Sequence, residues 1–214
     1  MRAVVVWQTL LLATLTAAQD GVAGVVYLIR HGEKVSHEGC LNDVGQARAA
    51  TLPSIFNGGI CEAPTIVFAH NYTAGVCQRC VDFATPLAND RGLAINSDFG
   101  SHTEAGNEGA AAAIYAALAT NDVILVVWEH HNLPRLAEAL LAQQGRAAEV
   151  PEEWDDDDFD SIYILVFEPD GEIGFSRAPS YAGPDTRLRR QKAHRGHASG
   201  KSHARADAVL AAPA

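Results

Sequence analysis

The sequence predicts an α/β protein with a doubly wound, mostly parallel sheet and helices on both faces. Short apolar runs rich in β-branched residues alternate along the chain with segments whose apolar residues recur at helical spacing. The last two apolar runs are separated only by Pro169-Asp170-Gly171, a turn sequence, so they are expected to form a C-terminal hairpin. This alternation predicts one domain over residues 22–180.

The expected elements follow one another in chain order, each placed by its apolar pattern and its flanking turn residues. The expected strands cover residues 25–29, 64–69, 93–95, 123–128, 162–167 and 172–175. The expected helices cover residues 43–56, 75–89, 109–118 and 134–144. Asn42 or Asp43 is placed to cap the first helix and Asn132 the last, which Gly145 follows as a stop signal.

The N-terminus has the layout of a secretory signal peptide. Met1-Arg2 precedes an apolar run from Ala3 to Ala17, and the small and polar residues that follow place the expected cleavage after Ala18. The run is too short to span a bilayer comfortably, so no stable membrane anchor is expected after cleavage. The alternative is that Val4 to Leu15 forms a core helix of the mature chain. We therefore expect a signal peptide over residues 1–18 and a secreted, extracellular protein.

Two further features agree with export. Asn71-Tyr72-Thr73 is an acceptor sequence for an N-linked glycan. The four cysteines permit two disulfides in three pairings. Disulfides or buried thiols are favoured over a metal, because only one Cys-x-x-Cys pair is present. The cysteines are Cys40, Cys61, Cys77 and Cys80.

Charge is distributed unevenly along the chain. The net charge of −10 disfavours nucleic-acid binding by the core. Acidic residues gather at 152–158, which are expected to form a solvated surface turn. From Arg177 to Arg205, eight Lys or Arg residues stand against one Asp, without apolar periodicity. Residues 182–214 are therefore predicted to be a disordered basic tail.

Arg30, His31 and Gly32 follow directly after the first expected strand. The C-terminal end of a buried strand is where open α/β sheets place their ligands. An imidazole beside a guanidinium suits phosphoryl chemistry, because its nitrogen can attack phosphorus while the planar cation binds two phosphate oxygens. Gly32 lets the backbone turn tightly and approach a bound group closely.

Two other charged residues occupy equivalent places. Arg79 falls in the first turn of the helix after the second strand, where free N–H groups already attract anions. His130 follows the most apolar strand of all. Because these positions face one edge of a parallel sheet, Arg30, His31, Arg79 and His130 are expected to converge on one phosphoryl group. Taken singly, His130 could be a core histidine and Arg79 a surface charge.

In these residues the chain resembles the histidine phosphatase superfamily, or phosphoglycerate mutase-like family, over most of residues 24–176. Four motifs in the family's order carry the resemblance, and they are specific only together. They are Arg30-His31-Gly32; the segment Leu41-Asn42-Asp43-Val44-Gly45-Gln46-Ala47-Arg48-Ala49; Arg79 ahead of Pro86-Leu87-Ala88; and His130 at the end of the strand from Val123.

The resemblance implies hydrolysis of a small phosphomonoester with no metal or organic cofactor. His31 would attack phosphorus and carry a phosphohistidine, while Arg30, Arg79 and His130 would bind the phosphoryl oxygens. For the proton donor to the leaving group, we expect Glu129, with Glu104 as the other candidate. Neighbours on a regular strand point to opposite faces, so only an irregular strand end would let Glu129 and His130 both enter the site.

Departures from the family pattern keep two other functions open. Phe83 stands where many members have Thr, and His131 where Gly is common. These favour, as an alternative, a non-catalytic phosphate-binding protein on the same fold. An intracellular phosphoglycerate mutase-like enzyme is a third possibility, which the residues Lys34 to Ser36 disfavour because mutase-type members carry an Asn there. No loop has a pattern that identifies the substrate.

Overall fold

The computed structural model describes residues 22–178 except 37–38, 73–75 and 101–103. The expected signal peptide at 1–18 and basic tail at 182–214 lie outside the described residues, as does Thr73 of the glycosylation acceptor. The limits of the predicted domain at 22 and 180 stay a prediction.

The sheet confirms the predicted fold class. Its strand order is β3-β2-β4-β1-β5-β6, in which β3, β2, β4 and β1 are parallel. β5 runs antiparallel to β1 and forms the C-terminal hairpin with β6. The strands are β1 (Gly24–Arg30), β2 (Ile66–Ala69), β3 (Ile95–Asn96), β4 (Val123–Trp128), β5 (Ile162–Phe167) and β6 (Ile173–Ala178).

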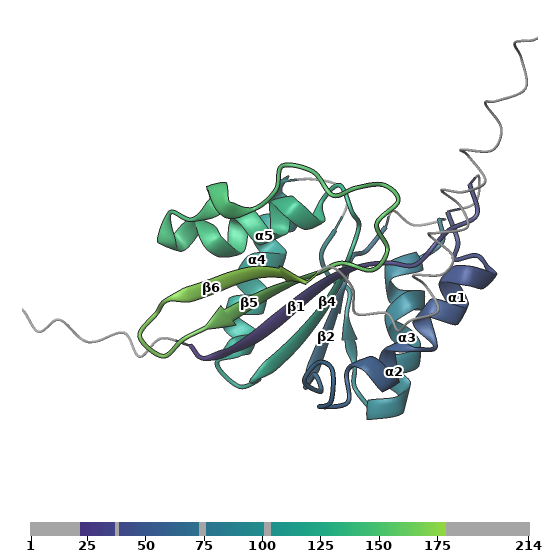
Figure 1. The fold of residues 1–214 in the computed structure, drawn as a ribbon, viewed down its shortest axis with the longest axis horizontal. Coiled ribbons are helices and arrows are strands. Elements are labelled where there is room, and N and C mark those ends of the chain that lie inside the picture. The colour runs from purple at the N-terminus through teal and green to yellow at the C-terminus, as the bar shows by residue number, and fades with distance from the viewer. Residues whose placement is uncertain (1–21, 37–38, 73–75, 101–103, 179–214) are drawn as a thin grey trace, which may run out of the picture.

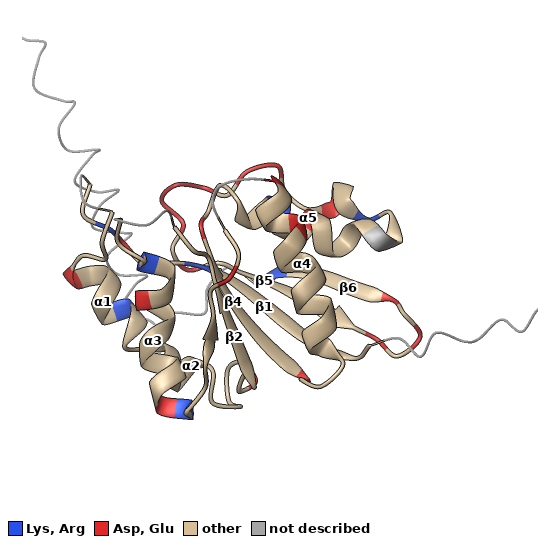
Figure 2. Ribbon diagram, turned by 180° about the vertical axis from the view of Figure 1, so that it is seen from behind, with Lys and Arg blue, Asp and Glu red and all other residues tan. Residues whose placement is uncertain are grey.

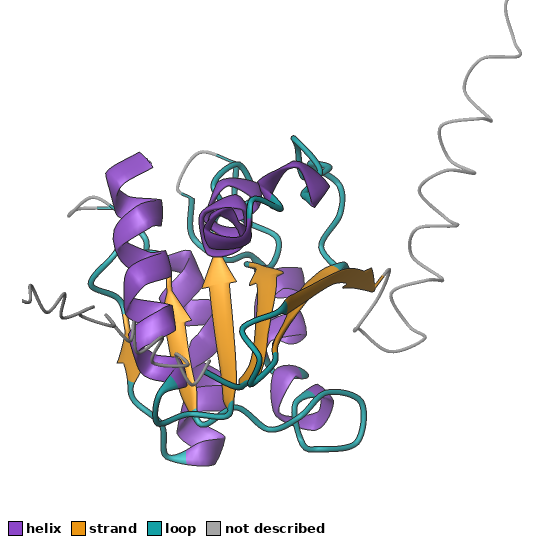
Figure 3. Cartoon of the chain, turned by 90° about the vertical axis from the view of Figure 1, so that its left-hand side faces the viewer, coloured by secondary structure: helices purple, strands orange, loops and turns teal. Residues whose placement is uncertain are grey.

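Helices cover both faces of the sheet (Figures 1 and 3). The helices are α1 (Asp43–Ala49), α2 (Leu52–Ile55), α3 (Arg79–Arg91), α4 (Glu104–Leu118) and α5 (Leu133–Leu141), with short 3₁₀ turns at Ala142–Gln144 and Ala147–Glu149. Side chains of α1, α2 and α3 pack on one face, and those of α4 and α5 on the other. Every residue of β4 is buried, because alternate side chains enter the two apolar clusters. This explains the unbroken apolar run of that strand.

Three of the expected helices have different limits. The helix expected over 43–56 is two helices, interrupted at Ala50 and Thr51. Pro53, which lacks an N–H donor, lies in the first turn of α2 and suits a new helix start. α3 begins at Arg79 rather than at residue 75, and α4 begins at Glu104 rather than at 109.

The cap predictions hold at one helix and fail at another. The Asn42 side chain accepts a hydrogen bond from Gly45 N at 2.9 Å and caps α1. Asn132 precedes α5, but its side chain makes no cap bond. The carboxylate of Glu129 accepts the N–H groups of His131 and Asn132 instead.

The cysteines take both of the expected forms. Cys40 and Cys77 form a disulfide, whereas Cys61 and Cys80 are buried thiols. The disulfide joins the loop before α1 to the segment before α3. Among the described residues, no helix combines the length and apolar character needed to cross a membrane.

Candidate active site

Four of the predicted site residues come together at the carboxyl edge of the parallel strands. Arg30 is the last residue of β1, and His31 follows it. His130 lies two residues beyond β4, and Arg79 is the first residue of α3. The rings of His31 and His130 lie edge to face with their centroids 6.2 Å apart. Both histidines and Arg30 are buried.

Two glycines let the loop after β1 pack closely against α1. A Cβ on Gly32 would lie 2.7 Å from Gly45 Cα and 2.8 Å from the Phe83 ring. A Cβ on Gly45 would lie 2.2 Å from the carbonyl oxygen of Glu33. Real side chains do not tolerate either contact, so both positions require glycine. Phe83, one of the departures from the family pattern, therefore supports the turn at Gly32 by direct packing.

His31 is held in one tautomer. Its Nδ1 lies 2.7 Å from the carbonyl oxygen of Gly32, an acceptor, so Nδ1 carries the proton and Nε2 carries a lone pair. Burial lowers the pKa of His31 to about 3, and the neighbouring cations Arg79 and Arg30 act in the same direction. His31 is therefore neutral, and able to attack, throughout the physiological pH range.

Arg79 contacts the unprotonated ring nitrogen of His31 directly. Its Nε donates to His31 Nε2 at 3.0 Å, which the tautomer of His31 permits. The guanidinium carbon lies 3.8 Å from the centroid of the Tyr72 ring, a cation–π arrangement that orients the planar group. Cys77, two residues before Arg79, is tied to Cys40 by the disulfide. The start of α3 is thus fixed from both sides.

The Arg30 side chain binds backbone carbonyl groups of the acidic loop. Its Nη1 donates to the carbonyl oxygens of Asp156 at 2.5 Å and of Asp155 and Asp158 at 3.3 Å. Its guanidinium carbon lies 3.9 Å from the centroid of the Phe159 ring. Arg30 Nε is buried and has no hydrogen-bond partner among the described residues. A buried donor without a partner is costly, so Nε is a place where a phosphoryl oxygen would be accepted.

The acidic loop at 152–158 exposes most of its carboxylates to solvent, as the sequence predicted, but two buried residues anchor it. It lies beside α5, where Figure 2 shows its acidic residues. Trp154 is buried and donates to the carbonyl oxygen of Asp158 at 2.8 Å. Asp158 is also buried, and hydrogen bonds from Ser161, Asp160 and Arg177 outweigh desolvation and lower its pKa to about 2. The nonlocal contacts with Arg30 and Arg177 fold the loop over the site.

A second ion-pair group fixes the motif glutamate. Arg48 on α1 donates two hydrogen bonds to Glu33, at 2.7 and 3.1 Å, and a third to Asp160. Although burial alone would raise the pKa of Glu33, pairing with Arg48 lowers it below its usual value. Glu33 is therefore an ionised structural group, and Arg48 on α1 joins it to Asp160, just beyond the acidic loop.

His130 lies between two carboxylates. Its Nε2 is 2.8 Å from Asp156 Oδ1, a hydrogen bond. Its Nδ1 is 2.7 Å from Glu129 Oε1, a close ion-pair contact without the alignment of a hydrogen bond. The Asp156 contact requires a proton between the two atoms, carried by the imidazole or by the carboxyl group. Sequence reasoning missed Asp156, because nothing local marks one aspartate within a run of four.

Glu129 enters the site because β4 ends at Trp128, so the alternation of the strand no longer applies. Its pKa is the balance of opposing effects: burial raises it, but the His130 and Asn132 contacts outweigh burial and hold it well below the usual range. An ionised carboxylate is poorly suited to donate a proton, so this geometry disfavours the expected proton-donor role. Glu104, the other candidate, is an exposed residue at the start of α4.

Three potential metal ligands lie together at the end of β4. Glu129, His130 and His131 have ligand atoms within 4.8 Å of one another. Glu129 Oε2 already accepts three hydrogen bonds, from His131 N, Asn132 N and Asn132 Nδ2, so the arrangement is that of a hydrogen-bonded group.

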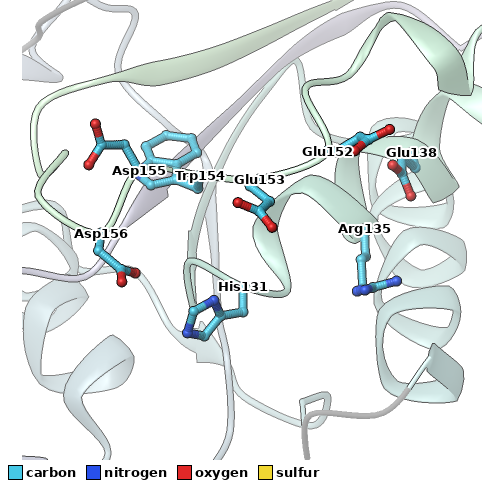
Figure 4. A pocket seen from close by; sticks show the side chains of 8 residues that line it. All are labelled: His131, Arg135, Glu138, Glu152, Glu153, Trp154, Asp155 and Asp156. Carbon is cyan, nitrogen blue, oxygen red and sulfur yellow. The ribbon is translucent and has the colours of Figure 1, made fainter.

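A cavity of about 590 Å³ lies between the start of α5 and the acidic loop (Figure 4). His131, Trp154 and Arg135 contribute to its wall, and Asp156, which contacts His130, joins it to the site. The remaining lining residues are the acidic Glu138, Glu152, Glu153 and Asp155. A group held in this cavity would therefore meet a negative potential.

No protein-family model and no curated protein matches this chain. Solved structures with a similar backbone include a predicted phosphohistidine phosphatase, SixA, from Nakamurella multipartitia (15% identity, TM-score 0.49, covering 75% of this chain and 98% of that one). Others are the protein histidine phosphatase SixA complexed with tungstate (18%, 0.47, 73% and 97%) and a mycobacterial glucosyl-3-phosphoglycerate phosphatase with inorganic phosphate (14%, 0.47, 75% and 98%). These values describe the arrangement of the backbone.

Proposed function

We propose that this chain is a phosphatase of the histidine phosphatase superfamily, which hydrolyses small phosphomonoesters through a phosphohistidine on His31. One observation carries the proposal. The nucleophilic nitrogen of His31 is unprotonated and faces Arg79, in a site that also contains Arg30 and His130. A neutral imidazole among fixed cations is the arrangement that attack on a phosphate dianion requires.

In the first step, a bond forms between His31 Nε2 and phosphorus while the bond from phosphorus to the leaving oxygen breaks. Arg79 Nε, which contacts Nε2 in the structure, would turn its donors to the phosphoryl oxygens. Arg30 Nε, buried without a partner among the described residues, would donate to a second oxygen. In the second step, water attacks phosphorus and gives one proton to the carboxylate that protonated the leaving oxygen, while the electron pair of the N–P bond returns to Nε2.

The leaving oxygen needs a proton, for which we propose Asp156 in place of Glu129. The contact between Asp156 and His130 Nε2 already holds one proton, and the Asp156 side chain is 77% exposed. A phosphoryl group bound by His130 would displace this carboxyl group towards the leaving group. Glu129 would then orient the His130 ring through its contact with Nδ1, the ring nitrogen that faces away from the phosphoryl group.

The proposal is tested by a phosphatase screen on the purified wild-type protein with a generic aryl phosphate and a panel of small phosphomonoesters. We expect turnover of the aryl phosphate and preference for leaving groups without further negative charge, because the adjoining cavity is acidic. Tight binding of inorganic phosphate without turnover of any ester would favour the non-catalytic alternative. A protein that neither binds inorganic phosphate nor hydrolyses any ester would refute both the phosphatase and the phosphate-binding alternative.

We also propose that the protein is exported, on the strength of its N-terminal sequence. In protein recovered from the medium of a eukaryotic secretory host, we expect the mature chain to begin near Gln19 and to carry a glycan on Asn71. N-terminal sequencing and glycosidase treatment measure both. An intact Met1 on cytosolic protein from the native cell would contradict export.

A further inference from the structure

A chain of buried polar groups runs from α4 to the catalytic edge. Trp128 Nε1 donates to Asn107 Oδ1 at 3.0 Å, and Asn107 Nδ2 donates to Asn132 Oδ1 at 3.1 Å. Asn132 Nδ2 donates to Glu129 Oε2 at 2.9 Å, and Glu129 Oε1 lies 2.7 Å from His130 Nδ1. All five residues are buried. The chain therefore joins the interior of one helix layer to a proposed phosphate ligand.

The direction of this chain is fixed at its first link. An indole N–H can only donate, so the atom of Asn107 that faces Trp128 must be the oxygen. The amide nitrogen of Asn107 must then face Asn132, whose own nitrogen in turn faces Glu129. Each amide thereby acquires one orientation, and a donor is always directed at Glu129 Oε2.

Asn107 is buried on α4 and can affect His130 only through the residues between them. It is 3% exposed and lies on α4, whose other buried residues are Ala110, Ala111, Ile114 and Leu118. A buried amide is costly unless both of its ends are hydrogen-bonded, and here both are. Its nitrogen holds Asn132, which fixes Glu129 Oε2 and leaves Oε1 facing His130.

We propose that Asn107 is a positioning residue for His130, acting through Asn132 and Glu129. This inference rests on the proposed function in one respect, that His130 binds the phosphoryl group. Loss of these hydrogen bonds would let the Glu129 carboxylate rotate. The buried His130 ring would then be held less firmly, although Asn107 itself does not contact the substrate.

Two substitutions of Asn107 have different effects on its hydrogen bonds: one removes both bonds, and the other replaces the donor to Asn132 with an acceptor. Asn107→Leu removes both bonds at similar volume, and we expect a loss of about tenfold in kcat, the order expected when a catalytic group is displaced by a fraction of an ångström. Asn107→Asp keeps the acceptor for Trp128 but turns a carboxylate oxygen towards Asn132 Oδ1. We expect it to be at least as damaging.

Tyr115→Phe is the matched control. Tyr115 lies on α4 and donates to the carbonyl oxygen of Leu140 on α5 at 2.8 Å, so its loss weakens the same helix pair outside the polar chain. We expect Tyr115→Phe to lower thermal stability but leave kcat unchanged. Equal losses of kcat in Tyr115→Phe and Asn107→Leu, at matched stability, would show that Asn107 only supports the fold.

A double-mutant cycle with His130→Ala tests whether Asn107 acts through His130. If it does, Asn107→Leu costs about tenfold in the wild-type background and nothing further in His130→Ala. The same loss in both backgrounds overturns the proposal. If His130→Ala alone has no effect on turnover, the assigned role of His130 in the proposed function fails instead.

A measurement without catalysis keeps the two failures apart. The ¹⁵N shifts of the His130 ring, assigned by their absence in His130→Ala, report the contact of Nδ1 with Glu129. We expect them to change in Asn107→Leu and to stay unchanged in Tyr115→Phe. Unchanged shifts in Asn107→Leu would refute the positioning role even if the protein proves to hydrolyse no ester.

Discussion

His31→Ala is expected to abolish turnover and the covalent intermediate together. A nucleophile cannot be replaced by the remaining binding groups, so we expect a loss of about 10⁴-fold or more in kcat on an aryl phosphate. Wild-type protein that is quenched with alkaline denaturant after a brief substrate pulse should carry phosphate that is stable to base and is lost on later treatment with acid. Mass spectrometry should place it on His31.

His70→Gln supplies the comparison. His70 is another buried histidine, which follows β2 at the same edge of the sheet, and its ring packs 4.9 Å from Trp128. Its ring packs on Trp128 and Tyr72, so we expect the His70→Gln protein to form the phosphoenzyme normally. Turnover that is equal in wild type and His31→Ala, or phosphate located on His70, would refute the assignment of the nucleophile.

The state of His31 would also set the acid limit of the proposed reaction. Because its pKa is lowered to about 3, the attacking nitrogen is lost to protonation only as the pH falls towards that value, far below the usual range for histidine. The environment that lowers the pKa is burial together with two fixed cations. The same environment attracts the phosphate dianion, so binding and readiness to attack have one physical origin.

The sequence could predict those parts of the fold that depend on local pattern. β4 is apolar at every position because both of its faces are buried, and β1 ends in charge because its last residue reaches the edge of the sheet. The turn at Gly171, which has a positive φ of 88°, was visible as Pro-Asp-Gly. Each of these signals is contained within a few consecutive residues.

The contacts that complete the site are between residues far apart in the sequence. Arg30 and Asp156 are 126 residues apart, and Arg30 donates a hydrogen bond to the backbone carbonyl of Asp156. Because every residue has a backbone carbonyl, the residue type does not predict this bond. Asn107 and Asn132 are 25 residues apart, and one asparagine in an alanine-rich helix carries no signal of its partner. The entry of Glu129 into the site depended on where a strand ended, the least predictable feature of any element.

Arg79→Lys is expected to lower kcat/KM although it keeps the positive charge. Lysine has no planar fork, so it cannot donate to His31 Nε2 and then to two phosphoryl oxygens from one fixed group. Its ammonium also cannot stack on Tyr72 as the guanidinium does. Loss of a hydrogen bond to a charged group costs about 1.5–3 kcal/mol, which corresponds to a roughly ten- to hundredfold loss of transition-state stabilisation.

Arg91→Lys makes the same chemical change at the other end of α3. Arg91 donates to the carbonyl oxygens of Phe56 and Pro53, far along the helix from His31. We expect this variant to lose some thermal stability and to keep its kcat/KM, whereas Arg79→Lys loses activity and keeps its fold by circular dichroism. If the two variants lost activity equally, or if Arg79→Lys matched the wild type, Arg79 would be a residue of the helix start and not a phosphate ligand. A loss confined to Arg79→Lys would instead mean that the phosphoryl group needs the guanidinium geometry, because charge, helix and substitution are the same in both proteins.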